Sequence, residues 1–199
     1  VEILTMTPDA AVTLASIAHR LRRHASLFAA FALLCISSAF AGDSSIEYAV
    51  KGAYLYKLLP FVDWPASVFA APNAPLAICI IGRNPFGAGF DKAVAEQHID
   101  THPVVIRRDA AAGDASCQIA FIGITEQQAE SDALRAFDGK PVLTVTDSGA
   151  PLAGIFAFVV EQNHVRFDID DAAAAKDGLS ISSKLLGLAR TVKPRKAAP

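Results

Sequence analysis

The sequence has little sulfur, little charge and no excess of positive charge. Its 199 residues include three cysteines, one methionine and one tryptophan, and charged side chains make up 19% of it. Three cysteines are too few for a small protein held together by disulfides. Lys and Arg total 18 against 20 Asp and Glu, whereas domains that bind nucleic acid usually carry a concentrated basic patch. The hydrophobic fraction of 52% excludes a disordered chain and predicts a buried core.

Residues 1–41 have the composition of a secretory signal peptide. The residues before Arg20 form a longer N-terminal extension than such a peptide needs, which indicates a start assigned too early. Three arginines between residues 20 and 23 come before a nearly uncharged apolar stretch at 25–36, and the small residues Ala39 and Ala41 follow on either side of Phe40. This is the order of a positive region, a hydrophobic region and a cleavage site. The apolar stretch is shorter than the roughly 20 residues of a membrane span. We expect residues 1–41 to be removed and the mature protein to reach the periplasm; an uncleaved N-terminal anchor is the alternative.

The remaining chain alternates predicted strands with predicted helices. Five apolar segments predict strands at 76–81, 103–107, 118–124, 142–146 and 155–160. Predicted helices cover about 44–59, a segment opened by Asn84 and Pro85, a segment from 125 to 139, and about 180–192. This alternation predicts an α/β fold, in which a mostly parallel sheet carries helices on both faces. We expect one domain over residues 42–193 and a frayed tail over 194–199.

Two local patterns refine this prediction. Apolar residues in the first helix recur every three or four positions and form one apolar face, made of Ile46, Ala49, Val50, Ala53 and Tyr56. Near the C-terminus, Gln162-Asn163 is a plausible tight turn between the fifth strand and an alternating segment at 165–169. This predicts a C-terminal hairpin at one edge of the sheet.

The residues after the first predicted strand form a candidate ligand site. The segment 82–89 is rich in glycine, but it ends in Gly-Ala-Gly, so it lacks the Gly-Lys-Ser/Thr of a phosphate-binding loop. It also lacks the dinucleotide fingerprint. Arg83 and Asn84 would nevertheless lie at a strand end beside a helix N-terminus, where a small anion or nucleotide can bind. A plain strand-to-helix turn is the alternative.

Other candidate sites are weaker. His98 and His102 have the spacing of two metal ligands on a helix, but Pro103 and the residues between them indicate that the helix has ended, so we expect no metal. A cluster of carboxylates at 168–171 does not match a calcium loop and is better explained as a helix cap. We find no nucleophile paired with a base and no cofactor motif, so we expect no enzyme.

Two cysteines remain in the predicted mature chain. Cys79 lies within the first strand and Cys117 at the start of the third. A pair of cysteines in an exported chain oxidises where the geometry allows it. Two buried free thiols are the alternative.

Several blocks of sequence resemble the YfiR-like family, in the same order from about 46 to 192. The blocks are Tyr48–Lys57, Phe61–Pro65, Leu76–Gly82, Asn84–Gly87, Cys117–Ile122, Val142–Asp147, Val165–Asp170 and Gly178–Ala189. The chain departs from the usual pattern at Pro60 and Asp170, and it lacks a second cysteine pair found in some members. Behind the predicted signal peptide, the blocks keep this order over nearly the whole predicted mature chain.

The resemblance implies a periplasmic, non-catalytic regulator with a Rossmann-like fold, often a homodimer. Such a protein holds an inner-membrane diguanylate cyclase inactive by contacting its periplasmic part, which lowers cyclic-di-GMP and thereby affects biofilm formation. An outer-membrane lipoprotein of OmpA type can sequester it. The resemblance also supports a disulfide between Cys79 and Cys117.

A binding protein needs a partner surface, and four aromatic residues near the end of the first helix are candidates. They are Tyr54, Tyr56, Phe61 and Trp64, and Tyr and Trp are enriched at interface hot spots. Alternatively, some of them seal the core. A second hypothesis for the whole protein is a periplasmic small-ligand-binding accessory domain of another signalling or transport system, with its site near Arg83.

Overall fold

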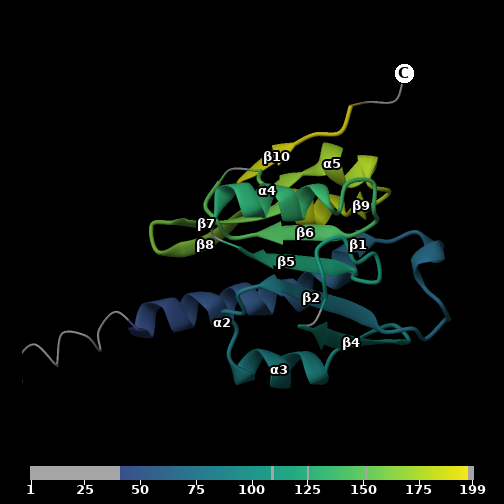
Figure 1. Cartoon of the computed structure of the whole chain (residues 1–199), viewed down its shortest axis with the longest axis horizontal. Helices are drawn as coiled ribbons and strands as arrows, with labels where there is room; N and C mark the ends of the chain where they lie inside the picture. The colour runs from purple at the N-terminus through teal and green to yellow at the C-terminus, as the bar shows by residue number, and fades with distance from the viewer. Residues whose placement is uncertain (1–40, 109, 125, 151, 197–199) are drawn as a thin grey trace, which may run out of the picture. The chain divides into compact units, whose positions relative to one another are not determined.

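The computed structural model describes residues 41–108, 110–124, 126–150 and 152–196. The chain divides into two units, 1–45 and 46–199. Of the first unit only the start of a helix is described, so most of the predicted signal peptide lies outside the described residues. The second unit, shown in Figure 1, contains the sheet and its helices.

An eight-stranded sheet has the order β10-β8-β7-β6-β5-β2-β4-β3. Its strands are β2 (Leu76–Gly82), β3 (His98–Ile99), β4 (His102–Arg107), β5 (Ile119–Gly123), β6 (Leu143–Thr146), β7 (Phe156–Glu161), β8 (His164–Asp170) and β10 (Thr191–Lys193). Strands β4, β2, β5, β6 and β7 are parallel neighbours, while β8 runs antiparallel to β7 and β3 antiparallel to β4. A two-stranded sheet pairs β1 (Val62–Asp63) with β9 (Ser180–Ile181). An α/β chain with a central, mostly parallel sheet is therefore confirmed.

The helices vary from four to eighteen residues in length. They are α2 (Ala41–Leu58), α3 (Ala88–Ala95), α4 (Gln127–Arg135), α5 (Asp171–Lys176) and α6 (Ser183–Leu186), with short 3₁₀ turns η1 (Leu59–Phe61) and η2 (Ala66–Val68). The first helix ends where expected, because Pro60 within η1 cannot continue the α-helical hydrogen bonding.

Alternate residues of the strands enter two separate hydrophobic clusters. Ile78 and Ile80 of β2 join the larger cluster with the buried residues of α2 and α3. Ala77, Cys79 and Ile81 of β2 join the smaller cluster with Ala133 of α4. The alternation explains why β2 reads as a continuous apolar run, since both of its faces are buried. The structure pairs Cys79 with Cys117 in a disulfide inside the smaller cluster.

Helix α2 presents its regular apolar face outward. Ile46 is 66% exposed and Val50 40% exposed, whereas Lys51, Gly52 and Leu55 are buried. Gly52 allows this close packing, because a Cβ atom there would lie 3.1 Å from the ring of Phe90. The periodic residues of this helix are therefore not the ones that bury it.

The C-terminal part of the chain differs from the prediction. The expected helix over 180–192 is wrong beyond one turn. The Ser182 hydroxyl caps this turn by accepting the N–H of Leu185 at 3.4 Å, and the turn ends at Leu186 with Gly187 as C-cap. The chain then forms β10, which pairs in parallel with β8. The β7–β8 hairpin is present, and both residues of its turn, Gln162 and Asn163, have positive φ. It does not form the sheet edge, because β10 lies outside it.

Three buried carboxylates hold β10 in place. Asp168 receives two hydrogen bonds from Arg190, Asp170 one from Lys193, and Asp171 two from Arg195. Asp170 also accepts the N–H of Ala173 at 2.8 Å and so caps α5, as the sequence predicts. Asp168 and Asp171 therefore accept hydrogen bonds from arginine side chains of the same chain.

Two helix starts also differ. The helix expected from Pro85 begins only at Ala88, because the side chain of Asn84 accepts the N–H of Phe86 at 3.1 Å and holds a turn. The helix expected from residue 125 begins at Gln127 with Glu126 as N-cap. Thr125, the first residue of that predicted segment, lies outside the described residues.

Candidate functional site

The carboxyl ends of three parallel strands meet at one edge of the sheet. Gly82 of β2 pairs with Gly123 of β5, and Ile122 of β5 with Thr146 of β6. The chain leaves β2 toward β4 on one side, while β5 lies on the other side, so the strand order reverses between β2 and β5. Ligands of open α/β sheets bind at such reversals, outside the carboxyl ends of the strands.

The backbones at this reversal lie unusually close together. The N–H of Arg83 donates to the carbonyl of Gly123 at 3.1 Å, and a Cβ atom on Gly123 would lie only 2.0 Å from the carbonyl oxygen of Arg83. Gly82 has a φ of 80°, a conformation that glycine adopts without strain. The two glycines therefore close the gap between β2 and β5 and direct Arg83 toward helix α2.

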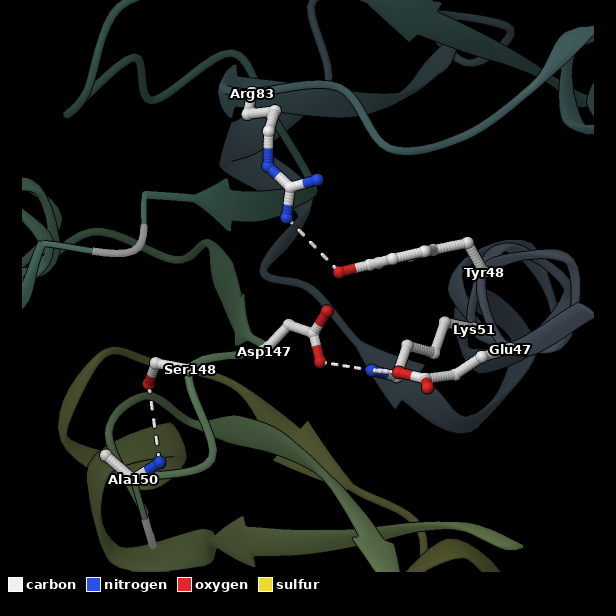
Figure 2. A network of polar contacts seen from close by, with 7 residues as sticks. All are labelled: Glu47, Tyr48, Lys51, Arg83, Asp147, Ser148 and Ala150. Carbon is white, nitrogen blue, oxygen red and sulfur yellow. Dashed lines mark hydrogen bonds and ion pairs between the residues drawn. The ribbon is translucent and has the colours of Figure 1, made fainter. Parts of the chain in front are cut away.

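Helix α2 supplies a buried lysine at the same edge. The ammonium group of Lys51, whose side chain is 3% exposed, donates to Glu47 one turn earlier and to Asp147 just after β6. The Lys51 nitrogen also lies 5.0 Å from the ring centroid of Tyr48 and 5.8 Å from that of Phe158. Figure 2 shows the lysine between its two carboxylates. The group links α2 to the end of the sheet.

The protonated state of Lys51 is stabilised despite its burial. Burial alone lowers the pKa of an ammonium group, but the hydrogen bonds and negative charges of Asp147 and Glu47 outweigh this effect and hold the pKa above 10.5. The ammonium form of Lys51 is therefore favoured in the folded protein.

A cavity of about 340 Å³ opens beside this ion pair. Its lining combines the polar groups above with apolar side chains at the end of β7: Glu47, Tyr48, Lys51, Asp147, Ser148, Gly149, Phe158, Val159 and Val160. Arg83 approaches from the other side of Tyr48: its guanidinium donates to the Tyr48 hydroxyl at 3.3 Å and lies 5.8 Å from the ring centroid. The arrangement places two cations and two carboxylates within one turn of helix and two strand ends.

A third carboxyl group lies near the loop after β6. Glu130 of α4 is 3% exposed, and its Oε1 atom has no hydrogen-bond partner among the described residues. Burial raises the pKa of Glu130, a hydrogen bond with Ser148 lowers it in part, and the charge of Asp147 raises it further. This carboxylate therefore resists ionisation more than an ordinary glutamate.

The predicted ligand residues have different roles. We call the group of Glu47, Tyr48, Lys51, Arg83 and Asp147 the polar edge; Arg83 joins it by its hydrogen bond to Tyr48. Asn84 instead uses its side chain in the turn before α3. Lys51, Glu47 and Asp147 were missed in the sequence. Two signals were present: Glu47 and Lys51 have the i, i+4 spacing of a helical ion pair, and Asp147 directly follows a predicted strand.

The four aromatic residues predicted to bind a partner separate into different environments. Tyr54 packs edge-on against Phe158 and Phe167, with centroids 5.9 and 5.7 Å apart, and lines a groove of about 230 Å³ with Phe61. Trp64 lines a separate cavity of about 190 Å³, and its indole N–H has no partner among the described residues. Tyr56 is half-buried against the larger cluster. All four thus contribute to the core and keep part of their surface accessible.

The two histidines with metal-ligand spacing lie on strands rather than on a helix. His98 and His102 lie on paired strands, β3 and β4, and His102 contacts the carbonyl of Ala74 at 2.6 Å. Within the described part of the chain, no group of three His, Cys, Asp or Glu side chains is arranged to hold a metal ion. In the same part, no helix has the length and apolar character of a membrane span.

The family assignment rests on a match between the chain and a family sequence model. The YfiR/HmsC-like model matches residues 48–190, which cover most of the second unit and all of its larger sheet except β10. The chain belongs to the YfiR/HmsC-like family. This family consists of periplasmic regulators of diguanylate cyclases. The match begins at Tyr48 and includes Lys51, Arg83 and Asp147, so the polar edge lies almost entirely within the family domain.

Proposed function

We propose that this protein is an exported, non-catalytic regulator that binds the periplasmic part of an inner-membrane diguanylate cyclase and holds it inactive. The observation that carries the proposal is the YfiR/HmsC-like match over residues 48–190. The regulator lowers cyclic-di-GMP and thereby limits biofilm formation. The predicted signal peptide supports export, since the cyclase region concerned lies in the periplasm.

The polar edge supports a binding role rather than a catalytic one. Its ammonium group donates to two carboxylates, whereas a catalytic base or nucleophile needs a free pair of electrons close to a substrate. The ion pair connects α2 to the end of β6 and so fixes the position of the helix. A fixed helix presents a preformed surface, which reduces the entropic cost of binding.

Cyclic-di-GMP in the source strain tests the proposal. Deleting the gene should raise its intracellular concentration, and the exported protein should restore it, whereas a copy without residues 1–41 should not. If the concentration stays unchanged on deletion in several growth conditions, the regulatory proposal is wrong. Co-purification of the tagged protein with a membrane diguanylate cyclase then identifies the direct partner.

The partner surface proposed here includes Tyr54 and Phe61, which line one groove, together with Tyr56 and Trp64. An OmpA-type outer-membrane lipoprotein is a second proposed partner that sequesters the regulator, and a homodimer is the proposed assembly. Alanine variants of Tyr54 and Phe61 should weaken cyclase binding while the purified proteins keep their circular dichroism spectra. Unchanged binding by both variants would remove the groove from the partner surface.

A second candidate function is a periplasmic ligand-binding accessory domain. The observation that favours it is the cavity of about 340 Å³ at the carboxyl ends of the strands, with Arg83 nearby. Thermal denaturation with nucleotides and small anions tests this candidate. A rise of the melting temperature that disappears in Arg83→Gln would support it, and no shift with any probe would count against it.

A further inference from the structure

Strand β10 is the outermost strand of the large sheet, yet its side chains add nothing to the hydrophobic core (Figure 1). Thr191 and Lys193 are exposed and Val192 is half-buried, and no residue of β10 belongs to either hydrophobic cluster of the described residues. A strand of three residues is also shorter than the usual length of about five or six. Since burial of apolar surface contributes little here, polar contacts must hold β10 against β8.

Ion pairs with one cluster of carboxylates supply these contacts. We call Asp168, Asp170 and Asp171 the aspartate cluster, and residues 190–195 the strap. The strap donates to this cluster from three side chains, Arg190, Lys193 and Arg195, over nitrogen–oxygen distances of 2.6, 2.8 and 2.6 Å. Its backbone follows the same path, since the N–H of Arg190 donates to the carbonyl of Phe167 at 2.8 Å and residues 191–193 pair in register with 168–170. The strap therefore lies along β8 as an extended basic segment.

The two sides of these ion pairs differ in their exposure to water. The carboxylate side chains of the cluster are 1, 9 and 5% exposed, whereas the paired cations are 32, 58 and 43% exposed. The cations can therefore leave β8 without disturbing packed side chains. The carboxylates stay fixed at the end of β8 and the start of α5, and a buried carboxylate left without a cation is costly. The cluster thus favours any basic segment that lies extended beside it.

The strap also extends beyond the domain that the family shares. The YfiR/HmsC-like match runs from residue 48 to residue 190, so it includes the aspartate cluster and ends at the first residue of the strap. Without β10, β8 is the edge strand of the sheet, because β7 occupies its other side. The unpaired N–H and C=O groups of an edge strand pair readily with an added strand. The family domain therefore contains the complete receptor for a strand, and the strap covers it.

We propose that the strap is a displaceable cover over a strand-addition site on β8. The segment that replaces it belongs to another protein, is extended, and has basic residues at its first, fourth and sixth positions, as the strap does. Its backbone adds to β8 by β-augmentation, and its cations form the charge-assisted hydrogen bonds that the strap gives up. This surface uses residues 168–171, whereas the groove proposed above for the cyclase uses residues 165–167 of the same strand. The proposal does not depend on the identity of the cyclase.

Hydrogen exchange of the protein, exported with its own leader and purified, tests whether the strap opens by itself. The amides of residues 191–193 should exchange at least about 100-fold faster than those of β5 at the centre of the sheet, because only local opening is needed. The triple variant Arg190→Gln/Lys193→Gln/Arg195→Gln should exchange faster still at β10 and at residues 168–170. A matched control, Lys92→Gln/Lys184→Gln/Lys196→Gln, removes the same charge from three exposed lysines and should exchange as the wild type does. Exchange of β10 as slow as that of β5 in the wild type would overturn the proposal.

A synthetic peptide with the sequence of residues 188–196 tests the site as a receptor. It is added to the triple variant, because in the wild type the attached strap competes at a high effective concentration. Fluorescence anisotropy should show binding, and a peptide with glutamine at the three basic positions should bind at least about 100-fold more weakly, since it loses three charge-assisted hydrogen bonds. A shuffled peptide of the same composition should also bind more weakly, because only the native spacing matches the cluster. No binding, or equal binding of the native and shuffled peptides, would overturn the proposal.

Circular dichroism verifies that each variant is folded. If the triple variant does not fold, Lys193→Gln takes its place in both experiments, because Lys193 is the most exposed of the three cations. The carboxylate that it releases belongs to Asp170, which still caps α5. Cyclic-di-GMP is measured separately: an unchanged concentration on deletion of the gene would reject the proposed regulator and leave the strand-addition site intact.

Discussion

The ammonium group of Lys51 on α2 bonds the carboxylate of Asp147, which lies 96 residues later at the end of β6. Both side chains are largely buried, and Glu47 completes the group. A buried ion pair of this kind adds little net stability compared with apolar residues, but removal of one partner leaves an uncompensated charge. The pair therefore determines where α2 rests on the sheet. Helix α2 also carries Tyr54 and Tyr56 of the proposed partner surface.

The first prediction concerns this lysine. Lys51→Met should lower the free energy of unfolding by about 3–5 kcal/mol, because Asp147 and Glu47 lose their common cation. Thermal and urea denaturation measure the effect. Lys92→Met on α3 is the matched control, since Lys92 is exposed, and it should change stability by less than about 0.5 kcal/mol. Equal stabilities of the two variants would show that the ion pair has no structural role.

The second prediction concerns Glu130, whose pKa burial raises. A raised pKa in the folded state means that the native protein binds the proton more tightly than the unfolded chain. Stability therefore falls as the pH rises from the ordinary value of 4.5 through the folded pKa, and the loss is complete above it. Glu130→Gln removes this loss, so the variant should be more stable than the wild type at pH 7 and similar to it at pH 4. A variant less stable than the wild type at pH 7 would contradict this account.

The third prediction concerns the contact between the ends of β2 and β5. Gly123→Ala places a Cβ atom against the carbonyl of Arg83, so the two backbones must separate, and we expect a loss of at least about 2 kcal/mol. Gly89→Ala is the control, because nothing lies within 4 Å of its Cβ position. Gly89 lies within α3, where alanine is favoured over glycine by up to about 1 kcal/mol. The two substitutions should therefore shift the melting temperature in opposite directions.

These residues also show what the sequence could and could not predict. Strand β2 is buried on both faces, and its continuous apolar run predicts this from the local sequence alone. The orientation of α2 does not follow from its own residues, because Lys51 and Gly52 occupy buried positions where apolar side chains are expected. Lys51 is buried by a partner 96 residues away, and Gly52 by the packing of Phe90. The spacing of residues within α2 predicts neither of these contacts.

The last strand illustrates the same limit. Leu185 and Leu188 have helical spacing, which favours a helix through residue 192. The structure instead ends α6 at Leu186 and adds β10 to the sheet, where Arg190 and Lys193 meet buried carboxylates of β8. Both members of each pair were visible in the sequence, but their matching depends on the fold.

The fourth prediction concerns the disulfide between Cys79 and Cys117. It closes a loop of 38 residues, for which the chain-entropy relation estimates a stabilisation of about 4 kcal/mol. Reduction, or the double variant Cys79→Ala/Cys117→Ala, should lower the urea midpoint of unfolding accordingly. Titration of free thiols in the same sample verifies that the disulfide is reduced. If the urea midpoint of the reduced wild type is nevertheless unchanged, the disulfide does not stabilise the fold.

The fifth prediction concerns the attachment of β10 at low pH. The hydrogen bonds and the charge of Arg195 hold the pKa of Asp171 below its ordinary value of 3.8, against the opposing effect of burial. The stabilisation from this pair is therefore fully present above about pH 4 and is lost as the pH falls through the folded pKa. Arg195→Gln should be less stable than the wild type at pH 7, and the difference should narrow as the pH falls below 3.8.

The control for this pair is Arg135→Gln, since Arg135 and Asp132 are both more than half exposed and exposed pairs contribute little. It should follow the wild type at every pH. Carbon-13 NMR of the aspartate carboxyl groups gives the decisive reading: the pKa of Asp171 should rise in Arg195→Gln, because burial then acts without its cation. An unchanged pKa would show that the side chain of Arg195 does not set the ionisation of Asp171.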